Sequence, residues 1–120
     1  MNETKRQDLA KRTKDFALRI IRLYSALPKT TEAQVIGKQV LRSGTSVGAH
    51  YREARRAKSD ADFISKMEGG LQELDETAYW LELLVESGLV KPEKLKPLMA
   101  ECEELTAMFV SMVKTVKSRK

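Results

Sequence analysis

The sequence predicts an all-α fold, a single antiparallel four-helix bundle that spans residues 1–120. Apolar residues recur at alternating spacings of three and four in four successive segments, which is the pattern of amphipathic helices that share a core. Short stretches with proline, glycine or helix-capping residues separate these segments. A chain of 120 residues with only three prolines is long enough to form one such core as a single domain.

The first helix is expected over residues 4–27, and it ends there because Pro28 disfavours helical geometry in the residue before it. Its apolar seam is Leu9, Phe16, Ile20, Leu23 and Leu27, with Thr13 or Arg12 in the missing turn. The second helix is expected over residues 32–57, where Thr31-Glu32-Ala33-Gln34 forms a capping box at its start. Its seam is Ile36, Val40, Ser43, Val47, His50 and Ala54.

The third helix is expected over residues 60–87. Ser59 is a typical N-cap, acidic residues follow it in the first turn, and Gly88 is a typical helix-ending residue. The predicted seam is Met67, Leu71, Leu74, Ala78, Leu81 and Val85.

The fourth helix is expected over residues 92–118, since Pro92 suits a first turn. Its seam is Leu95, Leu98, Cys102, Leu105, Phe109, Met112 and Val116. Pro97 predicts a break or kink near the start. Short connections between all four helices predict an up-down-up-down order.

The glycines inside predicted helices include the pair Gly44 and Gly48 and the adjacent Gly69 and Gly70. Each costs about 1 kcal/mol relative to alanine in a helix. Their presence predicts close backbone approach, either between helices or between subunits.

The composition predicts a soluble cytoplasmic protein. The single cysteine, Cys102, excludes an internal disulfide framework. No apolar run approaches the roughly 18 residues of a membrane span, and the N-terminus lacks a hydrophobic signal region. Charge is distributed unevenly, because residues 1–58 hold fourteen basic against five acidic residues (net +9) and residues 59–120 hold eight against twelve (net −4). The basic half could face a polyanion, or the two halves could neutralise each other.

Polar residues interrupt the seam of the second helix, where Ser43, Ser46, His50 and Glu53 share one face. A hydrolytic triad of Ser46, His50 and Glu53 is disfavoured, because backbone amides in mid-helix are already bonded and leave no oxyanion site. A di-metal carboxylate site is also disfavoured, since the chain has one histidine and that site needs two Glu-x-x-His motifs. A hydrogen-bonded layer that sets helix register is favoured over direct ligand contact. No enzymatic activity, metal or cofactor is expected.

Three motifs carry a resemblance to a known family. They are Arg42-Ser43-x-x-Ser46-Val47-x-Ala49-x-Tyr51-x-Glu53-Ala54, Ser59-x-x-Asp62-Phe63 and Glu73-x-x-Glu76. Over residues 15–115 the chain resembles the bacterial four-helix bundle proteins called 23S rRNA intervening-sequence proteins. The resemblance implies a barrel-shaped homopentamer. A relative, the accessory variability determinant of diversity-generating retroelements, binds nucleic acid and a reverse transcriptase. The family usually has asparagine at the position of His50, and a histidine can become charged near neutral pH.

Basic residues in the first half are the candidates for nucleic-acid contact. Those of the first helix are Lys5, Arg12 and Arg19 at seven-residue spacing, with Lys11, Lys14 and Arg22 nearby. Those at the end of the second helix are Arg52, Arg55, Arg56 and Lys58. Such rows can neutralise phosphates, and the absence of zinc ligands or a recognition-helix motif disfavours sequence-specific readout. Tyr51, Tyr79 and Trp80 are candidate anchors of a subunit interface.

The preferred hypothesis is therefore a non-enzymatic homo-oligomer, with a pentamer implied by the resemblance, that binds RNA or DNA through its basic half. It would act as an accessory to a nucleic-acid-processing partner, such as a reverse transcriptase. The alternative is a structural or adaptor oligomer whose partner is another protein.

Overall fold

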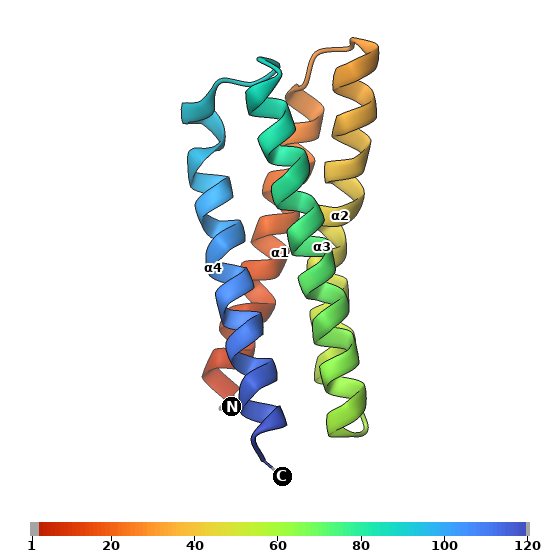
Figure 1. The fold of residues 1–120 in the computed structure, drawn as a ribbon, viewed down its shortest axis with the longest axis vertical. Helices are drawn as coiled ribbons and strands as arrows, with labels where there is room; N and C mark the ends of the chain where they lie inside the picture. The colour runs from red at the N-terminus through yellow and green to blue at the C-terminus, as the bar shows by residue number, and fades with distance from the viewer. Residues whose placement is uncertain (1–2, 120) are drawn as a thin grey trace.

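Four long helices make up the computed structural model, which describes the backbone of residues 3–119 and the side chains of residues 8–119. They are α1 (Glu3–Ala26), α2 (Thr31–Arg55), α3 (Asp60–Glu86) and α4 (Pro92–Lys117). The helices run alternately up and down in a bundle of 50 × 22 × 19 Å (Figure 1). The predicted all-α bundle and its order are confirmed.

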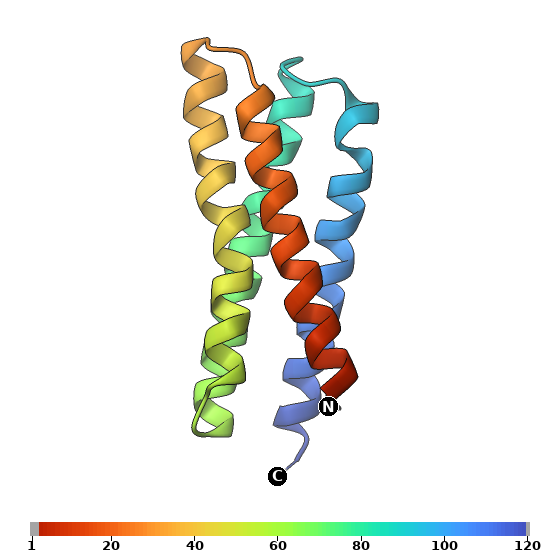
Figure 2. The ribbon, with the colours of Figure 1, turned by 180° about the vertical axis from the view of Figure 1, so that it is seen from behind.

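One end of the bundle holds the start of α1, the α2–α3 turn and the end of α4, and we call it the terminal end (Figure 1). α2 packs most extensively against α3, and α1 packs mainly against α2. Seen from behind, α1 lies between α2 and α4 and leans toward α4 at the terminal end (Figure 2). Because α1 and α4 make few contacts, this side of the bundle is its loosest seam.

Local capping accounts for the helix boundaries. The Ser59 side chain accepts a hydrogen bond from the Asp62 amide (3.0 Å), as predicted for an N-cap, and Gly88 follows α3 with a φ of 81° that favours glycine. The predicted capping box is displaced by one residue, because Thr30 rather than Thr31 is the N-cap and accepts from the Ala33 amide (3.3 Å). No break occurs at Pro97, since α4 continues through it to Lys117.

The buried face matches the predicted seam on α4 and, except for half-buried Leu23, on α1, whereas on α2 Gly37 and Tyr51 are buried in place of Ile36 and His50. All seven predicted positions of α4 are buried, and on α1 Thr13 fills the missing turn and donates a hydrogen bond to the Leu9 carbonyl (2.8 Å). On α3 the prediction is wrong by one residue at three positions: Gly70, Thr77 and Leu84 are buried, whereas Leu71, Ala78 and Val85 are only half-buried. α3 packs against both α2 and α4, so its buried face is centred between the two predicted rows.

Glycines allow helices of the same chain to approach closely. A β-carbon on Gly44 would lie 2.7 Å from Ile20 Cγ1 on α1, and one on Gly70 would lie 2.6 Å from Phe109 Cε2 on α4. Neither side chain can move freely, because Ile20 and Phe109 are fully buried. At these positions the predicted close approach is therefore between helices.

None of the helices within residues 3–119 is long and apolar enough to cross a membrane.

Candidate nucleic-acid interface

The last turn of α2 and the residues that follow it present a basic cluster at the terminal end, formed by Arg52, Arg55, Arg56 and Lys58; we call it the α2 cluster. All four side chains are exposed. Their positive charges lie at the C-terminus of α2, where the helix dipole is negative and favours cations. The Arg55 guanidinium also lies 6.0 Å from the ring centroid of Tyr51, so part of its role is packing. No ion pair links Arg52, Arg56 or Lys58 to the described side chains of residues 8–119.

The basic row on α1 has a different environment. Arg12 faces α4, where it donates hydrogen bonds to Glu101 (2.6 and 3.1 Å) and to Glu104 (2.9 Å). These bonds hold the pKa of Arg12 above its ordinary value. Arg12 is therefore a helix-joining residue rather than a free phosphate ligand, which corrects its place in the predicted interface. The reason is its angular position, since it lies beside the buried face and next to the loose α1–α4 seam.

The other α1 candidates differ in exposure. Lys11 forms an exposed i,i+4 ion pair with Asp15 (2.8 Å), Arg19 is half-buried, and Lys14 and Arg22 are exposed. Lys5 lies in α1, but its side chain falls outside the described residues. Among the α1 side chains that the structure describes, the exposed cations therefore do not follow the predicted seven-residue spacing.

Removing Arg12 tests its structural role. We expect Arg12→Ala to lower the free energy of unfolding by about 1–2 kcal/mol, because the half-buried Glu101 carboxylate would lose its partner. Urea denaturation measures the change. Lys11→Ala is the matched control, since its ion pair is exposed and should contribute less than about 0.5 kcal/mol. Equal effects of the two variants would contradict a structural role for Arg12.

The polar layer of α2 makes its buried contact with α3. The hydroxyls of Ser43 and Thr77 are hydrogen-bonded to each other (2.8 Å), and both residues are fully buried. The Thr77 hydroxyl also donates to the Glu73 carbonyl (2.7 Å). Ser46 does not join this layer, because its hydroxyl donates to the Arg42 carbonyl of its own helix (2.7 Å). A single buried hydroxyl pair therefore connects the two helices at this level.

A charged network continues the polar layer to the surface. Arg42 reaches across to α3 and contacts Glu73 (3.3 Å) and Glu76 (2.6 Å). His50 Nε2 lies 3.7 Å from Glu73, and His50 Nδ1 lies 4.0 Å from Glu53 of its own helix. The imidazole rests against the α3 backbone at Gly69, where a β-carbon would come within 2.8 Å of its Cε1 atom. These motif residues thus join α2 to α3 along one side of the bundle.

The described part of the chain has no group of side chains arranged as a metal site. Among the described residues, no three or more histidine, cysteine, aspartate or glutamate side chains are grouped so that they could hold a metal ion.

The three aromatic candidates differ in burial and in the residues that they contact. Tyr51 is 1% exposed and its ring contacts Phe109 at a centroid distance of 5.9 Å, so the expectation of a surface anchor is wrong for this residue. Tyr51 is buried because α2 turns it, rather than His50, toward the core. Tyr79 is 54% exposed, and its ring meets the half-buried Trp80 edge-on at 5.0 Å. Of these three candidates, the Tyr79–Trp80 pair is the one that offers an aromatic surface to another molecule.

Comparison with known proteins agrees with the motifs and the bundle. Residues 5–111 match the sequence model of the family described as 23S rRNA-intervening sequence protein. The chain belongs to this family. The chain is also similar to a solved structure, that of a protein with unknown function from the S23 ribosomal protein family of Bacteroides thetaiotaomicron VPI-5482. The two share 39% identity and a TM-score of 0.86, over 92% of this chain and 98% of the other. No curated protein matches.

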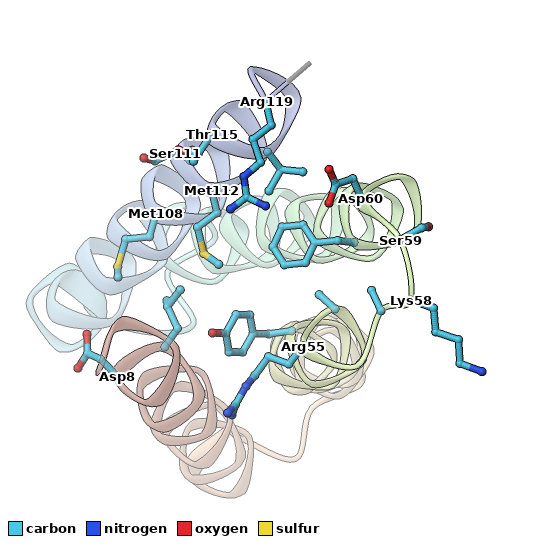
Figure 3. A pocket seen from close by; sticks show the side chains of 16 residues that line it. Asp8, Arg55, Lys58, Ser59, Asp60, Met108, Ser111, Met112, Thr115 and Arg119 are labelled. Carbon is cyan, nitrogen blue, oxygen red and sulfur yellow. The ribbon is translucent and has the colours of Figure 1, made fainter. Parts of the chain in front are cut away.

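The terminal end of the bundle has a hollow that the sequence analysis did not predict. It has a volume of about 730 Å³ and is lined by residues of all four helices (Figure 3). Two small residues line it, Ala54 in the last turn of α2 and Ala57 just after the C-cap of that helix. The small side chains at these two positions are the sequence signal that could have indicated the hollow. The hollow directly adjoins the α2 cluster, since Arg55 and Lys58 line it.

Proposed function

We propose that this protein is a non-catalytic, cytoplasmic homo-oligomer that binds RNA or DNA through the α2 cluster. The observation that supports it is the exposure of Arg52, Arg56 and Lys58 together at one helix end, without ion-pair partners among residues 8–119. Cations held this way are available to phosphates, whereas Arg12 and Arg42 are engaged with glutamates of the chain itself. Binding would depend on charge and backbone geometry rather than on base sequence.

Oligomerisation would strengthen this binding. A homopentamer, the form implied by the family resemblance, would present five copies of the α2 cluster, and several weak contacts made at once give a much higher overall affinity. The proposed role is that of an accessory that holds a nucleic acid for a processing enzyme, for which a reverse transcriptase is the candidate partner.

Charge reversal of the α2 cluster tests the proposal. Fluorescence anisotropy of a structured RNA and a DNA duplex is measured at about 50 and 200 mM salt. Three phosphate contacts alone predict a loss of about 40-fold in affinity across this range, and Arg52→Glu with Arg56→Glu should lower affinity at least tenfold at low salt. The matched control is Lys94→Glu with Lys96→Glu, which makes the same charge change on exposed residues at the opposite end of the bundle.

Light scattering on the same samples measures the oligomeric state and so separates two explanations for a loss of nucleic-acid binding. Loss of binding by an intact oligomer would support the α2 cluster as the nucleic-acid surface. Dissociation of the oligomer would assign the arginines to a subunit interface, and a failure of the unaltered protein to bind at low salt would overturn the proposal.

A protein-binding adaptor is the second candidate, and one surface favours it. Exposed Tyr79 and half-buried Trp80 lie beside Asp75, Glu76 and Glu82 on α3. Trp80 Nε1 is buried and has no hydrogen-bond acceptor among the described residues. An aromatic pair with acidic neighbours suits a basic protein segment.

A further inference from the structure

The hollow at the terminal end is large enough for a ligand of moderate size. Its volume of about 730 Å³ lies within the range of roughly 300–1,000 Å³ that small-molecule sites occupy. Buried side chains of Leu9, Met112 and Val116 close its base, and the buried ring of Tyr51 contributes from α2. The bundle core therefore ends here in an apolar floor.

The walls of the hollow are polar and carry both signs of charge. The Asp60 carboxylate of α3 lies at the rim, whereas the side chains of Asp8 and Ser111 point away from the hollow (Figure 3). The side chain of Arg119 turns inward beside Met112, whereas Lys58 points away from the hollow (Figure 3). An aliphatic ligand would leave these polar groups without partners, so the walls disfavour a simple lipid tail.

We propose that the hollow receives one unpaired nucleobase of a strand that is held by the α2 cluster. This inference rests on the proposed function and specifies its substrate as a single strand. A base needs a flat apolar contact for its face and donors and acceptors for its edge. Phe63 is half-buried and lines the hollow, so it is the aromatic side chain that a base can reach, while Asp60 and Arg119 can bond to a base edge.

The position of the hollow connects it to the phosphate-binding surface. Arg55 and Lys58 of the α2 cluster also line the hollow, with the Lys58 side chain directed away from it, so the cluster adjoins the rim of the hollow. The inward Arg119 guanidinium can pair with a phosphate or stack on the base (Figure 3). A base inside a duplex cannot enter, because it is paired and stacked.

The test compares strands of the same sequence with and without a complement. Fluorescence anisotropy at about 50 mM salt measures the affinity of the protein for a short single-stranded RNA, for its duplex, and for an abasic version of the single strand. Stacking of one base predicts that the single strand binds about 5- to 150-fold more tightly than the duplex, and that the abasic strand falls to the level of the duplex.

Two variants locate the preference. Ala57→Trp, at a half-buried position that lines the hollow, should fill the hollow and remove the preference for the single strand while duplex binding persists. Ala107→Trp makes the same change on the exposed face of α4, outside the hollow, and should retain the preference. Phe63→Leu should lower the affinity for the single strand through lost stacking alone, so a folding defect in Ala57→Trp leaves the test intact.

The outcomes separate this inference from the proposed function. Equal affinity for both strand types, or a preference that survives Ala57→Trp and Phe63→Leu, would overturn the base site and leave the α2 cluster as a duplex-tolerant surface. No binding of any strand would overturn both. Displacement of the strand by an equal concentration of AMP would show that the site serves a free nucleotide, which would also overturn it.

Discussion

Phe109→Ala is expected to lower the free energy of unfolding by about 3–5 kcal/mol, the range found when a fully buried aromatic side chain is truncated. Phe109 is 0% exposed, packs against the Tyr51 ring, and fills the space left by Gly70. Urea denaturation at fixed protein concentration measures the change, since oligomer stability depends on concentration. Val110→Ala, the exposed neighbour on α4, should cost less than about 1 kcal/mol.

The pairing of Phe109 with Gly70 makes a sharper version of this prediction. In the unaltered chain Gly70→Ala should destabilise, because the new β-carbon would lie 2.6 Å from Phe109 Cε2. In the Phe109→Ala background the obstacle is gone, and the same change should stabilise by up to about 1 kcal/mol through helix propensity. The same sign in both backgrounds would show that Gly70 is not present to admit the ring.

Cys102 is expected to react with a thiol reagent about a thousandfold more slowly in the native protein than in the unfolded chain at the same pH. Burial raises the pKa of the thiol from 9.0 to about 12, and the negative charges of Glu103, Asp75 and Glu101 contribute to the same increase. Only the thiolate reacts, and this higher pKa lowers the thiolate concentration at pH 8 by about three orders of magnitude. The change in absorbance of a disulfide reagent at about pH 8 measures the rate at which Cys102 reacts, with and without urea.

A relocated cysteine is the control for that rate. Cys102→Ser combined with Glu103→Cys places the thiol at the adjacent exposed position, where it should react at nearly the unfolded rate. Fast reaction of native Cys102 would mean that the α3–α4 contact opens readily, against its 2% exposure and its position 3.4 Å from the Leu74 carbonyl.

The raised pKa of Cys102 also sets the sign of an effect of pH on stability. The folded thiol keeps its proton while the unfolded thiol loses it, so the stability contribution of Cys102 is fully present below about pH 9 and is lost as pH rises toward 12. The slope is at most about 1.4 kcal/mol per pH unit. The unaltered protein should therefore lose stability above about pH 9 more steeply than Cys102→Ser.

Local chemistry by itself determines most of the fold. Pro28, Ser59 and Gly88 act through their own backbone preferences and hydrogen bonds to near neighbours, so the sequence predicts helix ends within about two residues. The predicted seam of α4 is complete because a regular alternation of three and four residues identifies one helical face without knowledge of its partners. The family motifs likewise need only residue types at fixed spacing.

Tertiary structure decides which side chains remain available for binding. The sequence leaves Thr13 and Arg12 as alternatives, and the proximity of α4 directs Thr13 into the core and Arg12 to Glu101. Tyr51 is predicted at the surface and is buried, because neighbours on two sides set the centre of a buried face. The hollow beside the α2 cluster is not predictable from periodicity, since it forms where four helices end at the same level. Periodicity reports one helix at a time, whereas a site depends on how several helices meet.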